Sequence, residues 1–346
     1  MVCTHNDGSY WNKLIALGIT PHDLVLRKLS LSTLFKLLKI LRKEKPDLIH
    51  THGKGPGLYG RLLGWMLGIP VVHTFHGFQH KLLPVVQRWF YLFVENVLTL
   101  LTRHHIFVGN GEKNKAKVLM FLNDSNSSVV NNGIDLDSIQ ALPPAEEVLA
   151  SLKLGPRESI KIFGTLSRVS PEKGLDTLLE GFVEAAKRAP YIRLLVIGDC
   201  PGEHEKYIKM ITQYIHENGL DDAVKILGAR EDALEILKSI DFYISPSRSE
   251  GLPYNLLEAL AVGKPVMATD IPGNNDIIRK SVEGILVPVN SARTLAHGIL
   301  TLLELGPEER KAMRQNGKVR IRDEFSLNLM SEKTFSIYKK VLEGVS

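Results

Sequence analysis

Short apolar runs alternate with helix-forming segments along almost the whole of this chain, and the alternation stops once and then restarts. Residues 70–75 and 193–197, for example, are apolar runs that are each followed by a longer segment with helical spacing. Strands that alternate with helices predict βαβ units, in which the strands are parallel and helices cover the sheet. The pattern therefore predicts an α/β protein with two doubly wound domains in series.

A proline-rich, polar stretch separates the two series. Residues 136–159 hold three prolines with polar residues between them, which is typical of a connection between domains. A chain of 346 residues is also long for a single hydrophobic core. We therefore expect an N-terminal domain over residues 1–140, a C-terminal domain over residues 155–326 and a closing helix over residues 327–346 that returns to the first domain.

Cysteine content and hydropathy indicate a cytoplasmic protein. The two cysteines, Cys3 and Cys200, form no disulfide framework, so reduced thiols are the simple interpretation. No apolar run reaches the ~18 to 20 residues that a membrane-spanning helix needs. The first residues also lack the basic-then-apolar layout of a signal peptide.

Charge is distributed unevenly along the chain. Through Asn123 there are 16 Lys and Arg against 6 Asp and Glu, whereas the remainder holds 27 against 32. A basic half suggests an anionic partner. Nucleic acid is not expected, because no helix-turn-helix, zinc or aromatic RNA-binding signature is present. A phosphorylated acceptor or peripheral contact with the inner face of a membrane fits better, and the very apolar segment 83–101 is interpreted first as a core helix and second as a membrane-interface helix.

The stretch from Ser245 to Ala261 predicts a phosphate-binding helix end. It follows a short apolar strand, and Pro253 comes just before an unbroken helix-forming run, a common place for proline. Free backbone N–H groups at such a helix start favour a phosphate. Glu250 and Glu258 flank this end, and since carboxylates repel phosphate, their expected partners are hydroxyl groups of a ribose and a sugar. Two solvated glutamates remain the plain alternative.

A second loop offers two cations. Residues 164–174 follow the first strand of the second half, and Arg168 and Lys173, five residues apart, can converge on one anion. By itself this could also be a solvated loop.

These motifs resemble those of retaining family 4 glycosyltransferases. The strings E-G-L-P-x-N-L-L-E-A from Glu250 and G-x-L-x-R-x-x-x-x-K-G from Gly164 match the family's signatures, and the likeness extends over residues 47–341, especially to members that build capsule, O-antigen or lipopolysaccharide. The resemblance implies the GT-B fold, in which two Rossmann-like domains face each other across a cleft. It makes Glu258 the ribose ligand, Glu250 a contact of the donor hexose, and Arg168 and Lys173 the diphosphate clamp together with the donor-binding residues Gly164, Gly251, Asn255 and Leu256.

The same resemblance assigns roles outside these two motifs. Gly228 and Arg230 lie at the end of an expected strand, at the turn that contacts the nucleobase in the family. Asp199 matches the second position of the family's G-D/E-G pattern, whereas Cys200 departs from the glycine at the third. His76, in V-V-x-T-x-H-G, implies a contact to the donor sugar near the reacting carbon. His52 and Lys54, expected to open a helix, fall on an acceptor-side segment.

Metal ligation by the histidines near residues 50–52 and 73–76 is an alternative, because histidine is the commonest metal ligand. We expect no metal site, since no cysteine or suitably spaced carboxylate pair lies nearby. The expected cofactors are likewise none, with a nucleotide diphosphate sugar as substrate rather than cofactor.

The expected function is transfer of a hexose from a nucleotide diphosphate sugar, preferably UDP-linked, to a glycan or lipid-linked acceptor with retention at the anomeric carbon. Two alternatives stay open: a nucleotide-sugar epimerase of the same fold, and a truncated remnant that binds nucleotide without turnover. The second arises because the family begins with a strand and a Gly-rich loop, whereas this chain opens at what resembles the second strand. We therefore expect a missing first strand upstream.

Overall fold

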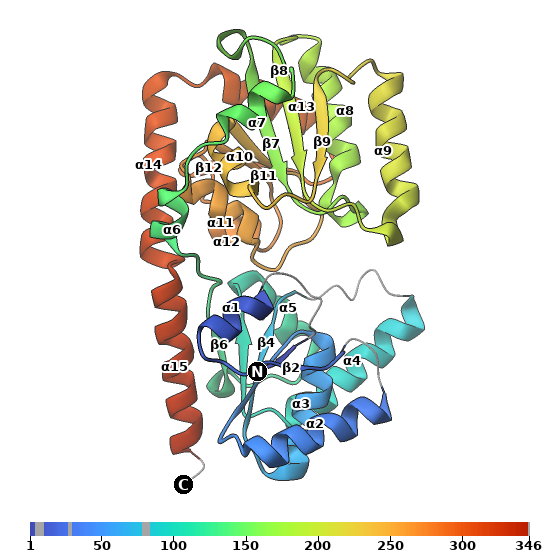
Figure 1. Ribbon diagram of the computed structural model, residues 1–346, viewed down its shortest axis with the longest axis vertical. Coiled ribbons are helices and arrows are strands. Elements are labelled where there is room, and N and C mark those ends of the chain that lie inside the picture. The colour runs from blue at the N-terminus through green and yellow to red at the C-terminus, as the bar shows by residue number, and fades with distance from the viewer. Residues whose placement is uncertain (4–9, 27–29, 78–83, 345–346) are drawn as a thin grey trace. The chain divides into compact units, whose positions relative to one another are not determined.

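The computed structural model describes residues 1–3, 10–26, 30–77 and 84–344, and the chain divides into two compact units (Figure 1). Each unit is an α/β domain with its own parallel sheet. The first unit consists of Met1–Val108, Glu112–Val130 and Glu332–Ser346, and the second of Gly109–Gly111 and Asn131–Ser331.

The first unit contains a four-stranded parallel sheet with the order β3-β4-β5-β6 and a separate pair of short parallel strands, β1 and β2. Its elements in chain order are β1 (Val2–Cys3), α1 (Tyr10–Ala16), β2 (His22–Asp23), α2 (Leu31–Glu44), β3 (Ile49–His52), α3 (Lys54–Leu67), β4 (Val71–Phe75), α4 (Val85–Leu100), β5 (His104–Phe107), α5 (Asn110–Leu119), the 3-10 helix η2 (Asp124–Asn126) and β6 (Ser127–Val129).

Local chemistry explains where the helices of the first unit begin and end. The Ser30 side chain caps α2 by accepting a hydrogen bond from the Thr33 amide, and Lys45 ends the helix in the left-handed conformation ahead of Pro46. Gly68, with φ of +70°, closes α3 in the same way. Residue 83, where we expected α4 to begin, lies outside the described residues.

The apolar runs at residues 24–26 and 47–50 predict two strands in the first unit, and the structure places both strands elsewhere. The apolar run at residues 24–26 is not a strand, because Leu24 and Leu26 instead pack into a cluster with α2 and α3, and pairing occurs at β2 just before them. The expected strand at residues 47–50 lies two residues later, as β3. His52 therefore ends a strand and does not open the following helix, which starts at Lys54.

A buried ion pair joins α3 to α4 inside the first unit. The Nη2 atom of Arg61 donates to Oε2 of Glu95 at 2.9 Å, and both side chains are buried. The Nε atom of Arg61 also donates to the Gly57 carbonyl at 2.9 Å. Nearby, His73 on β4 shares a 2.7 Å hydrogen bond with Thr51, and burial, followed by the positive charge of Arg61, lowers its pKa well below the ordinary value.

The second unit contains a six-stranded parallel sheet and most of the remaining helices. Its elements in chain order are α6 (Leu136–Ala141), α7 (Glu146–Ser151), η3 (Arg157–Ser159), β7 (Lys161–Leu166), η4 (Pro171–Lys173), α8 (Leu175–Ala186), β8 (Ile192–Ile197), η5 (Gly202–His204), α9 (Glu205–Glu217), β9 (Val224–Gly228), α10 (Ala233–Ser239), β10 (Phe242–Ser245), α11 (Tyr254–Ala261), β11 (Val266–Thr269), α12 (Asn274–Ile277), β12 (Gly284–Val287), α13 (Ala292–Glu304) and α14 (Pro307–Glu324). The last helix, α15 (Leu327–Glu343), begins in the second unit and belongs to the first unit from Glu332 on.

The strand order of this sheet is β12-β11-β10-β7-β8-β9, so the chain starts in the middle, runs to one edge and then returns to fill the other half. Numbered along the chain this is the 3-2-1-4-5-6 order of doubly wound folds. The direction of winding reverses between β7 and β10, which pair directly, with Tyr243 opposite Gly164. Ligands of such folds bind beyond the carboxyl ends of the strands at this switch point.

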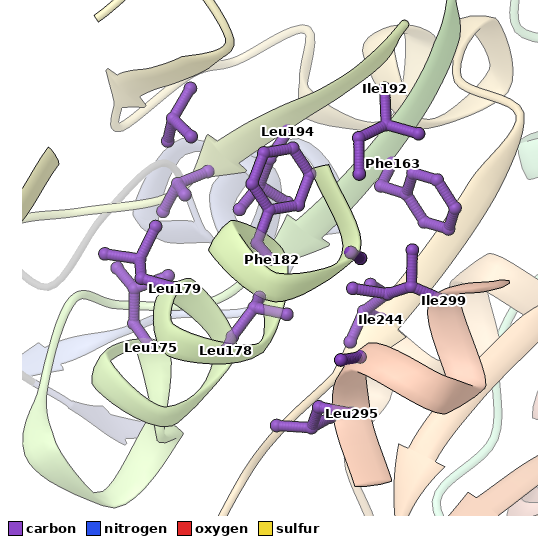
Figure 2. Close-up of a cluster of buried hydrophobic side chains, with 14 of the residues drawn as sticks. Phe163, Leu175, Leu178, Leu179, Phe182, Ile192, Leu194, Ile244, Leu295 and Ile299 are labelled. Carbon is purple, nitrogen blue, oxygen red and sulfur yellow. The ribbon is translucent and has the colours of Figure 1, made fainter. Parts of the chain in front are cut away.

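A large apolar core holds one face of the six-stranded sheet. Leu178 and Phe182 of α8 and Ile299 of α13 point towards strand residues such as Leu194 and Ile244 (Figure 2). All five are fully buried. Because successive strand residues face opposite sides, Tyr243 and Leu195 are buried on the other face of the sheet. Because both faces of the sheet are covered, its strands are continuous apolar runs in the sequence.

The buried Arg61–Glu95 pair gives a stability prediction for the first unit. Arg61→Ala leaves the Glu95 carboxylate buried without its cation, so we expect a loss of about 3 to 5 kcal/mol in the free energy of unfolding. The double variant Arg61→Met/Glu95→Leu removes both charges and should cost less than Arg61→Ala. Urea unfolding followed by tryptophan fluorescence measures this, because all three tryptophans, at positions 11, 65 and 89, lie in the first unit. A double variant less stable than Arg61→Ala would contradict the prediction.

Candidate functional site

An ion pair connects the loops after β7 and β10, at the switch point of the second unit. The Nζ atom of Lys173 donates to Oε1 of Glu250 at 2.7 Å, and the Ser247 hydroxyl donates to the same oxygen at 2.7 Å. The side chain of Glu250 is only 9% exposed and that of Lys173 17%. The structure thus brings together a cation from one predicted motif and a carboxylate from the other.

Arg248 fixes the β7 loop against the β10 loop, a role that no sequence motif predicted. Its guanidinium donates to Asp176 Oδ2 and Thr177 Oγ1, both at 2.8 Å, and to the Pro171 carbonyl. Although burial opposes the shift, hydrogen bonds from Arg248 and Tyr207 lower the pKa of Asp176 below its usual range. Arg248 lies inside the motif that predicted the site, but its partners are more than 70 residues away in the chain, so no local pattern identifies its role.

Two glycines allow the strand ends to approach one another closely. Gly174 has φ of +68°, and a Cβ atom there would lie 2.2 Å from the Pro246 carbonyl oxygen. Gly198 has φ of +143°, and a Cβ atom there would lie 2.1 Å from the carbonyl oxygen of Ser167. Any other residue would be both strained and in collision, so the backbone geometry of this edge requires glycine at both positions.

The start of α11 is fastened to the end of β7. Pro253 is the N-cap residue, and the Asn255 side chain donates to the Leu166 carbonyl through Nδ2 and accepts from the Leu256 amide at 2.9 Å. Gly251, just ahead, is buried, and Leu256 is fully buried beneath the helix start. The positive end of an eight-residue helix thus lies beside the Lys173–Glu250 pair.

Glu258 is the second carboxylate of the site, and its environment differs from that of Glu250. It is half-buried on α11, and no hydrogen bond or ion pair to its carboxylate is found among the described residues. Burial raises its pKa to about 7. A carboxyl group so placed is ready to accept hydrogen bonds from hydroxyl groups that a ligand would bring.

The remaining predicted donor-binding residues differ in exposure. Arg168 is 54% exposed, with Nη2 3.7 Å from the Glu172 carboxylate. Gly228, with φ of +69°, ends β9, and Arg230 lies exposed two residues later, paired with Asp232. Most of the predicted donor-binding residues lie at one edge of the sheet, because the carboxyl ends of parallel strands point the same way. The segments that follow β7, β8, β9 and β10 at this edge carry Arg168, Lys173, Asp199, Gly228, Arg230 and Glu250.

Gly164 is one predicted donor-binding residue that the structure places elsewhere. It lies inside β7, paired with Tyr243 and Leu195, and a Cβ atom there would lie 2.6 Å from Ile240 Cδ1. The glycine therefore permits close packing of the sheet and does not belong to the loop. Asp199 is exposed, and its carbonyl oxygen accepts a hydrogen bond from the Val169 amide at 2.8 Å, which ties the loops after β7 and β8 together.

In the first unit, two of the predicted residues contact each other. His52 ends β3 and His76 follows β4, and the Nδ1 atom of His52 lies 2.9 Å from Nε2 of His76. One ring must donate and the other accept, so the pair cannot carry two charges without losing this bond. Desolvation, followed by the neighbouring His52, lowers the pKa of His76 to about 4. His76 is therefore neutral at physiological pH, suited to hydrogen bonding.

The closing helix takes part in this histidine cluster, which the sequence did not reveal. His50 shares hydrogen bonds with Tyr338 of α15, at 2.5 Å, and with Thr74, at 2.7 Å, and its ring lies 4.2 Å from that of His52. Burial, followed by the neighbouring His52, lowers the pKa of His50 to about 3. Since positions 50 and 338 are 288 residues apart, only the folded structure can show the link.

Lys54 begins α3, and its Nζ atom lies 4.7 Å from the centre of the Tyr91 ring. Metal ligation was an alternative for the nearby histidines. Within the part of the chain that the structure describes, no group of three or more His, Cys, Asp or Glu side chains could hold a metal ion. Over the same residues, no helix is both long enough and apolar enough to cross a membrane.

Comparison with protein families matches both units. The family model described as "Glycosyltransferase Family 4" matches residues 2–138, and the model described as "Glycosyl transferases group 1" matches residues 151–320. Between them they cover most of the chain.

Named relatives agree with these matches. The chain is 29% identical over 330 residues to the UDP-Gal:alpha-D-GlcNAc-diphosphoundecaprenol alpha-1,3-galactosyltransferase of Escherichia coli, covering 90% of this chain and 77% of the relative. It is 28% identical over 283 residues to the alpha-monoglucosyldiacylglycerol synthase of Streptococcus pneumoniae, covering 79% of this chain and 62% of the relative.

Solved structures show the same fold. A glycosyltransferase from Rickettsia africae superposes with a TM-score of 0.83 at 22% identity, covering 99% of this chain and 90% of the other. The Anabaena protein HepE, solved in complex with UDP, also gives 0.83, at 20% identity over 96% of this chain and 90% of the other. The matched families, the relatives and the α/β architecture lead to one conclusion: this chain is a glycosyltransferase of family 4 with the GT-B fold.

Proposed function

We propose that this glycosyltransferase moves a hexose from a UDP-sugar to a lipid-linked glycan acceptor, with retention at the anomeric carbon, in the synthesis of a surface polysaccharide. The observation that carries the proposal is the gathering of Lys173, Glu250 and the start of α11 at the switch point of the second unit. The E. coli relative is named for a UDP-galactose donor and a diphosphoundecaprenol acceptor, and HepE was solved with UDP, which supports the nucleotide and the acceptor class.

The diphosphate of the donor is assigned to the cations and to the helix start. Arg168 and Lys173 both lie in the segment after β7. Arg168 is exposed and Lys173 contacts Glu250, so we assign both cations to an anion placed at the N-terminus of α11. These fixed positive groups stabilise the negative charge that develops on the departing UDP. They supply the charge that a divalent cation supplies in other transferases, and we propose that this enzyme needs neither metal nor cofactor.

The two carboxylates are assigned to the two sugars of the donor. Glu250, held by Lys173 and Ser247, takes hydroxyl groups of the hexose, and Glu258 takes those of the ribose. The uracil lies against the turn from Gly228 to Arg230, where a glycine with positive φ leaves the backbone uncovered. His76 is assigned to the hexose as a neutral hydrogen-bonding group, oriented by His52, and Lys54 to the acceptor side.

The contacts of Glu250 support retention of configuration at the anomeric carbon. Glu250 is already engaged by a cation and a hydroxyl, so it is poorly placed to act as a nucleophile. We propose front-face attack, in which the acceptor hydroxyl bonds to the anomeric carbon as the bond to UDP breaks. The leaving β-phosphate then takes the proton of that hydroxyl, so charge and protons balance without a covalent enzyme intermediate.

The proposal is tested by incubating the protein with UDP-glucose, UDP-galactose and their N-acetyl derivatives, together with a polyprenyl-diphosphate-linked sugar. Transfer with an α-linked product, read from the anomeric proton by NMR, supports it. An epimerised UDP-sugar formed without acceptor would instead indicate an epimerase. UDP binding without turnover on any donor and acceptor pair would overturn the transferase assignment for this chain.

Glu258 should link UDP binding to pH. Its pKa is raised to about 7 in the free protein, and ribose hydroxyls donate stronger hydrogen bonds to the ionised carboxylate than to the neutral acid. Binding therefore lowers this pKa, and UDP affinity should rise as pH increases through about 7. Glu258→Ala should weaken UDP binding by about 1.5 to 3 kcal/mol. UDP itself also titrates, so the wild type and Glu258→Gln are compared by calorimetry over the same pH range. Glu258→Gln should lose the part of the change of UDP affinity with pH that exceeds the titration of UDP. If neither variant changes the affinity or its pH dependence, the ribose role is refuted.

Glu250 should affect turnover more than nucleotide binding. Glu250→Ala removes a hydroxyl acceptor at the hexose but frees Lys173 for phosphate, so UDP affinity should be retained or improved. We expect kcat to fall about tenfold to a hundredfold, which corresponds to one charge-assisted hydrogen bond in the transition state. Ser247→Ala, which removes the other partner of Glu250, serves as the milder control. Loss of UDP binding with unchanged kcat would reverse this assignment.

Activity should not depend on a divalent metal, because Arg168 and Lys173 supply the positive charge at the leaving group. Turnover in EDTA should equal turnover in buffer, and Lys173→Ala should lower turnover in either condition. Loss of turnover in EDTA that manganese restores would contradict the proposal.

A further inference from the structure

Helix α4 presents an apolar surface to solvent along its whole length. Trp89, Phe90 and Phe93 are 67%, 68% and 66% exposed, and each carries a large aromatic ring. They belong to a stripe at helical spacing, the apolar face of α4, which consists of Val85, Val86, Trp89, Phe90, Phe93, Val97 and Leu100. A folded protein rarely leaves so many adjacent large apolar side chains in water unless something covers them.

The opposite side of α4 already supplies the core of the first unit. Leu92, Glu95, Leu98 and Thr99 are buried there. A helix that is buried on all sides is therefore wrong for this segment. The outward apolar residues take no part in this packing, so they are available to a partner outside the chain.

The apolar face of α4 continues onto the end of α3. Trp65 and Met66 are largely exposed, and Trp65 and Leu100 both line a cavity of about 650 Å³. Arg103 also lines this cavity and places a cation at the edge of the apolar surface. The surface thus combines exposed tryptophans with a basic rim, the composition of membrane-interface segments.

Basic residues outnumber exposed acidic residues around this surface. The single acidic residue of α4, Glu95, is buried and neutralised by Arg61, and the single basic residue is Arg88. Helix α3 packs between α4 and α2, and four exposed basic residues of α2 face solvent, against one exposed acid, Glu44. The four basic residues are Lys36, Lys39, Arg42 and Lys43.

We propose that the apolar face of α4 inserts into the interface of a bilayer that contains anionic lipids, with the basic residues of α2 resting on the lipid headgroups. Charge complementarity favours an anionic bilayer over a second copy of this chain, because two copies would bring two basic surfaces together. Helix α4 has 16 residues, about 24 Å at 1.5 Å per residue, so it lies in the plane of the interface and does not cross it.

Co-sedimentation with vesicles tests the proposal. The full chain should bind vesicles of phosphatidylethanolamine and phosphatidylglycerol, bind phosphatidylcholine vesicles weakly, and lose affinity for the anionic vesicles as salt increases. Phe93→Ser and Trp89→Ser should each lower the partition coefficient by at least about tenfold, because a large apolar group no longer leaves water. Phe335→Ser, which removes a phenylalanine 63% exposed on α15 of the same unit, is the matched control and should bind as the wild type does.

A spectroscopic measurement identifies the surface directly. The variant Trp11→Phe/Trp65→Phe keeps Trp89 as its only tryptophan, so its fluorescence reports on the apolar face of α4. Emission should shift to the blue on anionic vesicles, and brominated lipids should quench it. UDP titration of Phe93→Ser should match the wild type, which separates this proposal from the donor assignment. Urea unfolding followed by tryptophan fluorescence shows that the first unit of the variant is folded, because all three tryptophans lie in that unit.

Three results would overturn the proposal. The first is vesicle binding that Phe93→Ser and Trp89→Ser leave unchanged, which would place the membrane contact elsewhere. The second is the absence of binding to anionic vesicles at low salt. The third is a dimer that Phe93→Ser dissociates, observed without vesicle binding, which would assign the apolar face of α4 to a second copy of the chain.

Discussion

The ion pair between Lys173 and Glu250 makes the site of the second unit electrostatically consistent. A carboxylate beside the N-terminus of a helix would repel the phosphate that we propose this end binds. Here the ammonium group lies 2.7 Å from the carboxylate, so the local charge is balanced before any ligand arrives. The pair also joins the loops after β7 and β10, the two strands between which the winding of the sheet reverses. One contact therefore sets both the charge and the geometry at the switch point.

The two glutamates of the motif are chemically different groups because only one has a cation. Glu250 is nearly buried but receives hydrogen bonds from Lys173 and Ser247, whereas burial raises the pKa of Glu258 to about 7. Their separation in the chain is eight residues, and both follow the same strand, so only the environment distinguishes them. This difference supports the proposal that Glu250 and Glu258 take hydroxyl groups of two different sugars.

The sequence predicted those features that depend on local pattern. Strand and helix alternation predicted both parallel sheets, and the spacing around Pro253 predicted the start of α11. Features that depend on contacts between distant residues were not predictable. Arg248 reaches Asp176, and Tyr338 reaches His50, across long stretches of chain in which nothing indicates the pairing. Gly164 was misplaced for a related reason, since a glycine in a motif does not reveal whether it opens a loop or admits a neighbouring side chain such as Ile240.

Helix α4 shows how a buried charge can determine what a surface can bind. Its composition is apolar on every side, and the sequence could not say which side faces the core. The structure answers through Glu95, the only acid of the helix, which turns inward and meets Arg61 of α3. The negative charge is thereby neutralised inside the unit, and the outward side keeps apolar groups together with Gln87 and Arg88. If Glu95 faced solvent, an anionic lipid surface would repel the helix; because it is buried with a cation, the interaction that stabilises the first unit also leaves its outer surface compatible with such a membrane.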